Sequence, residues 1–102
     1  MKLLPPVPPE NFGDAQGKLW VQMAPICSKV REWSPAMVLA LNGYVRELDR
    51  LMVAEDWLTK NGSIIYIRDD KGILKSALPA PQLKVARDAA KLVARLGRQL
   101  GL

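Results

Sequence analysis

The sequence predicts a mainly α-helical fold: a kinked N-terminal helix, one long central helix, a short β-hairpin and a C-terminal helix. Three observations predict it. Apolar residues recur at helical spacing across residues 34–60, the pattern changes to a period of two after Gly62, and helical spacing returns after Pro81. A chain of 102 residues supports one domain, and it contains no run of 18 apolar residues that could span a membrane.

The central helix is expected to begin after Ser34, whose hydroxyl can cap free amides, and to end at Asn61-Gly62, which tolerates a left-handed conformation. Pro35 suits the first helical position because its φ is fixed. A seam of apolar side chains follows steps of four and three: Met37, Leu41, Tyr44, Leu48, Leu51 and Leu58. Glu55 takes the remaining seam position. Because an unpaired buried charge is costly, we expect Glu55 to have a cationic partner.

The same helix carries a second apolar stripe on its opposite side. The stripe includes Ala54, and the positions that we expect at an oligomer interface are Leu39, Gly43, Val53 and Trp57. Either the long helix contacts the core of its own chain on both sides, or one stripe packs against a second copy. A chain this small has little core with which to cover two stripes, so the second interpretation predicts a homo-oligomer.

The chain before the long helix divides into two parts. Residues 1–16 are rich in proline and are expected to form a flexible arm, whereas residues 17–102 are expected to form a single helical domain. Apolar spacing predicts a first helix over residues 15–32, which Pro25 should kink or split. Cys27 on this helix is interpreted as a small buried apolar residue. Trp33 is expected to close the corner that follows.

A hairpin is expected at about residues 63–76, with strands 63–68 and 72–76. The turn between them contains Asp69 and Asp70, which are more typical of turn formation with solvated carboxylates than of a metal site. Because a lone hairpin is unstable in water, its apolar face must lie on the helices or on a neighbouring copy.

The final helix is expected from Pro81 to about Leu100 and presents three ridges. One ridge has large apolar side chains for the core, and a second has small residues that allow another helix to approach closely. The third is a row of five cations, the candidate DNA-binding residues: Lys84, Arg87, Lys91, Arg95 and Arg98. This basic row could face phosphates, water or acidic residues of another copy.

The charge distribution favours a polyanionic partner. Residues 1–60 hold seven basic and seven acidic side chains, and residues 61–102 hold eight and three, so the second part carries the whole net charge of +5. The chain has no histidine and one cysteine, which excludes His-based catalysis, common zinc sites and an internal disulfide. We therefore expect no enzyme activity, cofactor or metal. Because Pro5-Pro6 follows Met1-Lys2-Leu3-Leu4, no signal peptide is expected, and a cytoplasmic location follows.

Several stretches resemble one known family. They are Tyr44-Val45-Arg46, Ala54-Glu55-Asp56-Trp57-Leu58, Asn61-Gly62, the hairpin Ser63–Ser76, the stretch from Pro79 to Lys91, the closing Leu96–Leu102, and Leu19-Trp20 and Ala24-Pro25 in the first helix. In this pattern, residues 15–102 resemble the small subunit of tailed-phage terminases. Relatives often have a longer, basic N-terminal arm and a tail beyond the Leu-Gly-Leu region, whereas this chain starts with a proline-rich segment.

The resemblance implies a non-enzymatic protein of phage genome packaging, encoded by a phage or an integrated prophage. Such proteins form ring-like homo-oligomers, recognise viral double-stranded DNA and deliver it to a large terminase subunit that carries the ATPase and nuclease. Two alternatives remain: a small oligomeric DNA-binding regulator, although no compact helix–turn–helix is visible, and an oligomeric adaptor that binds only protein.

Overall fold

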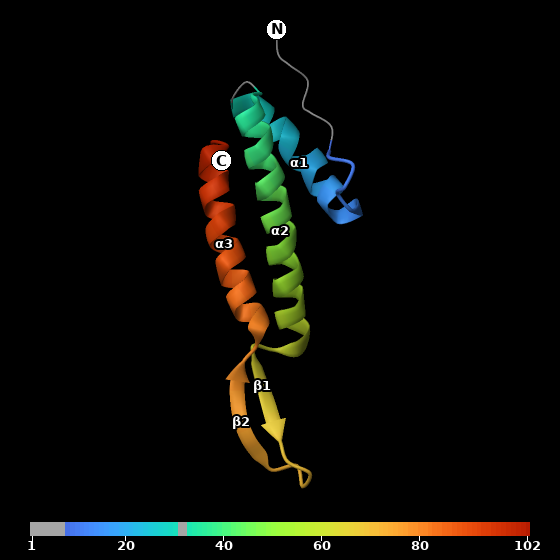
Figure 1. The fold of residues 1–102 in the computed structure, drawn as a ribbon, viewed down its shortest axis with the longest axis vertical. Helices are drawn as coiled ribbons and strands as arrows, with labels where there is room; N and C mark the ends of the chain where they lie inside the picture. Colours follow the sequence, from blue (N-terminus) through green and yellow to red (C-terminus); the bar gives the residue numbers. More distant parts are fainter. Residues whose placement is uncertain (1–7, 31–32) are drawn as a thin grey trace.

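A computed structural model describes residues 8–30 and 33–102 of the chain. It is mainly helical and elongated, with extents of 70 × 24 × 17 Å. The elements are α1 (Asp14–Val30), α2 (Pro35–Asn61), β1 (Ile64–Arg68), β2 (Leu74–Pro79) and α3 (Pro81–Gln99). Helices α2 and α3 lie side by side, α1 lies against one end of α2, and the hairpin projects beyond the other end (Figure 1). The prediction of a mainly helical chain with one hairpin is confirmed.

The long helix has the boundaries that the sequence predicts. Ser34 caps its start, since the Ser34 hydroxyl oxygen accepts a hydrogen bond of 3.2 Å from the backbone N–H of Met37. At its end, Gly62 has a φ of 81° and donates its N–H to the carbonyl of Leu58 at 2.8 Å. A residue with a side chain would be strained at this positive φ, so glycine fits the end of the helix.

The main core lies where α1, α2 and the end of α3 meet. Its buried side chains are Trp20, Ala24, Cys27, Met37, Leu41, Val45 and Leu100. Cys27 is fully buried, as predicted. Trp33 closes the corner between α1 and α2, because its indole N–H donates to the hydroxyl of Ser28 at 2.8 Å.

Helix α1 is not split at Pro25. It runs as one helix from Asp14 to Val30, and Pro25 is exposed on it. One missing donor does not divide the helix, since the side chains around it remain buried against α2. Residues 31–32 of the predicted first helix lie outside the described residues.

Part of the proline-rich segment packs on the core. The ring of Phe12 meets Trp20 edge to face at 5.7 Å, and the guanidinium of Arg46 lies 5.3 Å from the centre of the Phe12 ring. Residues 1–7 lie outside the described residues, so the flexibility of the arm stays a prediction.

Glu55 is not buried in the seam, and this prediction was wrong. Its side chain is exposed and forms no ion pair among the described residues, while the preceding Ala54 is 3% exposed. Ala54 belongs to the second stripe, on the opposite side of α2, and it lies beside Gln82 and Val85 of α3. Towards the end of the long helix, α3 therefore covers the second stripe, and the seam position of Glu55 stays exposed.

The hairpin is longer than predicted, since β2 extends to Pro79. The strands pair antiparallel from Ile64 opposite Pro79, with a bulge after Ile67. Beyond the paired strands, Ala80 donates its N–H to the carbonyl of Ser63 at 2.9 Å, so the hydrogen-bonded ladder continues to the start of α3. At the tip, a carboxylate oxygen of Asp69 accepts from the N–H groups of two residues at 2.9 Å, Lys71 and Ile73. The prediction that Asp69 forms the turn is confirmed.

Candidate nucleic-acid interface

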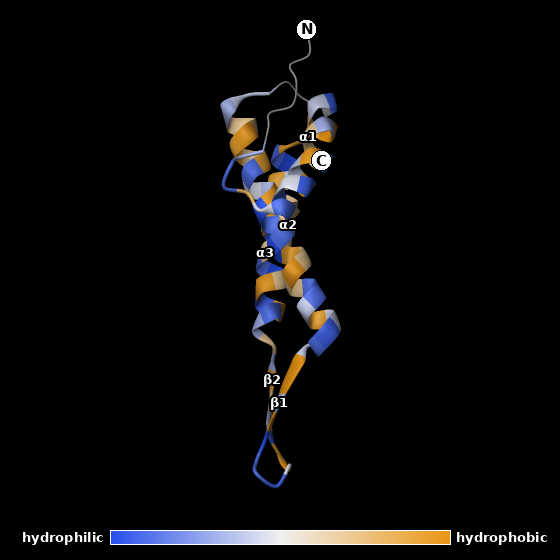
Figure 2. Cartoon of the chain, turned by 90° about the vertical axis from the view of Figure 1, so that its right-hand side faces the viewer, coloured by the Kyte–Doolittle hydropathy of each residue, from blue (hydrophilic) through white to orange (hydrophobic). Residues whose placement is uncertain are grey.

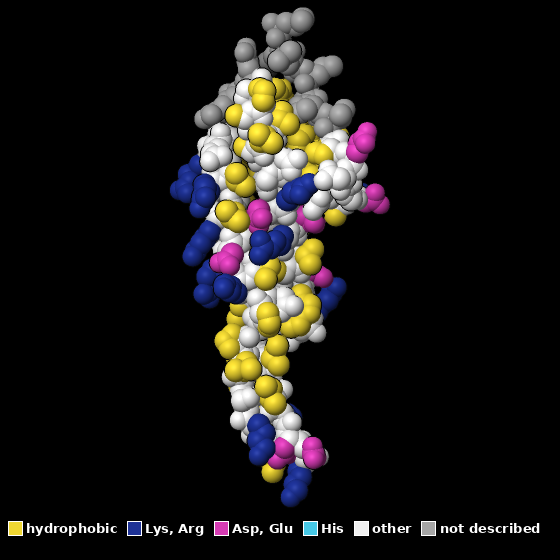
Figure 3. Space-filling view, in the orientation of Figure 1, with side chains coloured by type: hydrophobic (Ala, Val, Ile, Leu, Met, Phe, Trp, Pro, Cys, Tyr) yellow, Lys and Arg dark blue, Asp and Glu magenta, His cyan; other side chains and the backbone are white. Residues whose placement is uncertain are grey.

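Helix α3 presents its basic row to solvent. Helix α3 packs on α2, and Ala89 and Gly97 are buried on α3 while the five cations are exposed: Lys84, Arg87, Lys91, Arg95 and Arg98. Dark blue side chains line this edge of the molecule in Figure 3. The helical rise spreads the row over roughly 21 Å. The five cations therefore share one exposed face of α3, as the sequence predicts.

The basic row has no acidic partner within the described part of the chain. The ion pairs of the structure lie elsewhere: Arg50 with Glu47 at 3.3 Å, Lys60 with Asp56 at 2.9 Å and Lys75 with Asp69 at 3.8 Å. Like charges three and four positions apart repel mildly, so the row lowers the stability of α3. A polyanion lying along the row would remove that repulsion.

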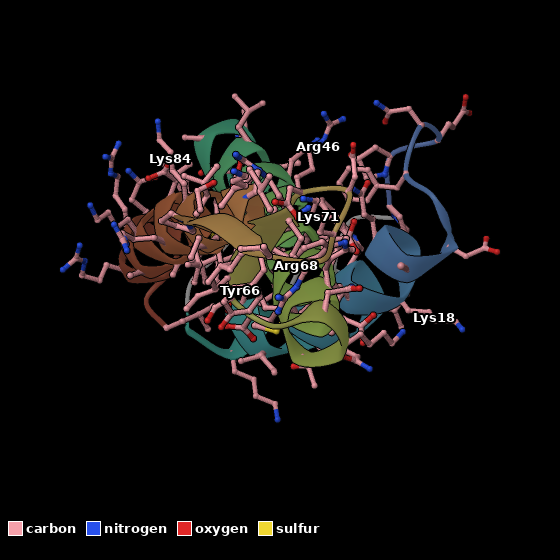
Figure 4. The ribbon with its side chains drawn as sticks, turned by 90° about the horizontal axis from the view of Figure 1, so that it is seen from below. Lys18, Arg46, Tyr66, Arg68, Lys71 and Lys84 are labelled. Carbon is pink, nitrogen blue, oxygen red and sulfur yellow. The ribbon has the colours of Figure 1, made fainter. Side chains whose placement is uncertain are left out.

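The hairpin tip is a second cationic surface, and its charge is more compensated. Arg68 donates from its guanidinium to the carbonyl of Gly72 at 3.2 Å, and Lys75 pairs with Asp69. In the view along the long axis, Lys84 lies on the α3 side and Lys18 on the opposite side (Figure 4). The unpaired cations of α3 are therefore the stronger candidate for a phosphate backbone.

The four residues expected at an oligomer interface do not share one surface. Leu39 and Val53 are 71% and 64% exposed, and Trp57 is half-buried. Gly43 faces α3, because Leu96 Cδ1 lies 3.2 Å from the position that a β-carbon on Gly43 would occupy. The oligomer interface stays a prediction for all four residues.

Val53 and Trp57 do come together in a groove between α2 and α3. The residues that line it are Asp49, Arg50, Val53, Ala54, Trp57, Gln82 and Val85. The side-chain oxygen of Gln82 is buried there without a hydrogen-bond partner among the described residues. Sequence reasoning missed this groove, since it depends on how α3 crosses α2, which the separate helical patterns do not give.

Among residues 8–30 and 33–102, no group of three or more His, Cys, Asp or Glu side chains is placed to hold a metal ion. Within the same ranges, no helix combines the length and the apolar character needed to cross a membrane.

The fold defines a small helical protein with a projecting hairpin and a cationic edge. A family model described as phage terminase, small subunit, matches residues 17–102. Because the match covers most of the chain, the protein belongs to the family of phage terminase small subunits, and a role in phage genome packaging follows. Searches of curated proteins and of solved structures gave no match.

Proposed function

We propose that the protein binds double-stranded viral DNA through the basic row of α3 and brings it to the large terminase subunit in the host cytoplasm. It acts as a homo-oligomer without catalytic activity of its own. One observation carries this proposal: five exposed cations follow one edge of α3 without an acidic partner among the described residues. Family membership supports a packaging role in general.

The chemistry of the row predicts the kind of DNA contact. Arginine and lysine on one helix face can follow phosphates along a strand, and phosphate contacts position a protein without reading bases. The row contains no asparagine or glutamine suited to adenine. Because phosphate contacts carry no sequence information, any sequence preference has to come from arginine contacts with guanine, from DNA shape or from another part of the chain.

Assembly would strengthen this contact. Each copy contributes one row, and an oligomer that presents several rows to one duplex gains affinity by effective concentration. Individually weak phosphate contacts can then hold DNA at moderate salt. Binding through several rows at once explains how a chain of this size can hold DNA without a compact base-reading motif such as a helix–turn–helix.

The experiment compares two triple variants of equal charge. One changes Lys91, Arg95 and Arg98 to glutamine in the row. The control changes three exposed lysines elsewhere to glutamine: Lys18, Lys29 and Lys60. We expect only the row variant to lose retention on duplex DNA, on all sequences alike. Circular dichroism and native mass first confirm that both variants keep their fold and assembly.

A further inference from the structure

The β-hairpin exposes apolar side chains on both of its faces. The register places Ile65 and Leu78 on one face and Tyr66 and Ala77 on the other. Its large apolar side chains are each 39% to 58% exposed: Ile64, Ile65, Tyr66, Ile67, Ile73, Leu74 and Leu78. They present on the order of 600 Å² of apolar surface, as much as the largest patch on a typical whole monomer.

The hairpin does not pack on its own helices. The hydrogen bond from Ala80 to Ser63 closes its base, and from there the strands run along the long axis, away from α2 and α3 (Figure 1). Strand β1 is largely hydrophobic in Figure 2. A two-stranded hairpin is at best marginally stable in water, so a partner has to cover these faces.

The groove between α2 and α3 is a second apolar surface without an occupant. It has a volume of about 450 Å³ and is lined largely by Val53, Ala54, Trp57 and Val85. The buried oxygen of Gln82 borders the same groove and lacks a hydrogen-bond donor among the described residues. Hydrophobic side chains continue from this end of the helix pair onto the hairpin (Figure 3).

We propose that the hairpin of one copy packs into the α2–α3 groove of the next copy. The hairpin supplies what the groove lacks: β-branched and aromatic side chains. The occupant is a second copy because every copy carries both surfaces, and the closed base of the hairpin keeps each copy from filling its own groove. The apolar area of the hairpin, summed over its two faces, is of the same order as the roughly 800 Å² per partner of a standard interface.

This contact joins two different surfaces, so it is head-to-tail rather than two-fold. Repeated head-to-tail contacts give a closed ring or an open filament. On α3, the groove residues Val85 and Gln82 lie roughly 120° and 180° around the helix from the centre of the basic row. Assembly therefore leaves the rows uncovered and repeats them around the oligomer. The inference rests on the homo-oligomer of the proposed function and names its contact.

Cysteine cross-linking without DNA tests the contact. Because Cys27 is fully buried, introduced cysteines are the accessible thiols. Val53→Cys is combined with Tyr66→Cys in one chain and with Ile67→Cys in another, so that the pairs sample both hairpin faces. Under mild oxidation we expect one of these chains to form a ladder of dimers, trimers and larger species. The control pair, Val53→Cys with Lys91→Cys, should give no ladder.

Four results would overturn the inference: no ladder from either hairpin pair, an equal ladder from the control, dimers formed as readily by Tyr66→Cys alone, or a monomer in native mass at high micromolar concentration. Dimers from the single variant would mean that hairpins meet each other across a two-fold axis. A monomer would also remove the homo-oligomer from the proposed function. The phosphate contact of the basic row is tested separately, by the salt dependence of the row variant, so failure of the hairpin contact and failure of the DNA proposal are distinguishable.

Discussion

Leu96 of α3 packs directly over Gly43 of α2. Its Cδ1 atom lies 3.2 Å from the position of a β-carbon on Gly43, and at Gly97 the corresponding distance to Cε2 of Tyr44 is 3.4 Å. In each helix, a glycine thus packs against a large side chain of the other helix. This interlocked contact fixes the rotation of α3 and therefore the direction in which the basic row points.

Gly43→Val should destabilise the protein. The added methyl groups overlap Leu96, and overpacking of a close contact costs about 1–3 kcal/mol. The matched control is Gly17→Ala in α1, where no atom lies within 4 Å of the added carbon. The control should be neutral or stabilising by up to about 1 kcal/mol. Urea unfolding at one protein concentration measures both, and equal stability of Gly43→Val and the parent would contradict the packing.

Ala54 and Glu55 should respond in opposite ways to substitution. Glu55→Gln changes an exposed carboxylate with no ion pair among the described residues, so the free energy of unfolding should change by less than about 0.5 kcal/mol. Ala54→Asp places a charge at a position that is 3% exposed and should cost more than about 2 kcal/mol. A denaturant titration measures both variants. If the free energy of unfolding fell more for Glu55→Gln than for Ala54→Asp, Glu55 would be buried in the seam as first predicted.

Stability should fall in alkaline solution. Burial raises the pKa of the Cys27 thiol, and burial together with the nearby Cys27 thiolate raises the pKa of Tyr44. The folded state therefore keeps both protons to higher pH than the unfolded state. The stabilisation is complete below the unfolded pKa values and is lost as the pH rises above about 9.

Thermal melting from pH 7 to pH 11 measures this decline, and Ellman's reagent at pH 9 reports on Cys27 itself. The native thiol should react far more slowly than the same thiol in denaturant. Equal rates in the two conditions would show that Cys27 is accessible in the folded protein.

Local signals in the sequence predict the helices well. Ser34-Pro35, Asn61-Gly62 and Pro81 set helix boundaries through local capping and backbone conformation, so tertiary packing does not override them. The exposure of the basic row was predictable for a similar reason, since helical geometry puts residues three and four apart on one face.

Tertiary relationships could not be predicted in the same way. Gly43 faces Leu96 because of how α3 crosses α2, and Ala54 is buried while Glu55 is exposed because α3 lies on the second stripe of α2. The period of two expected after Gly62 was inaccurate, since Ile64–Ile67 is a continuous apolar run. Such a run is typical of a strand covered on both faces.

The salt dependence of duplex DNA binding tests the central claim most directly. Each phosphate that the protein neutralises adds about 0.9 to the slope of log affinity against log salt. For the protein with Lys91, Arg95 and Arg98 changed to glutamine, we predict a slope shallower by about one to three units per copy. The control variant at Lys18, Lys29 and Lys60 should keep the parental slope. An unchanged slope in the row variant would contradict the account and move the DNA surface away from α3.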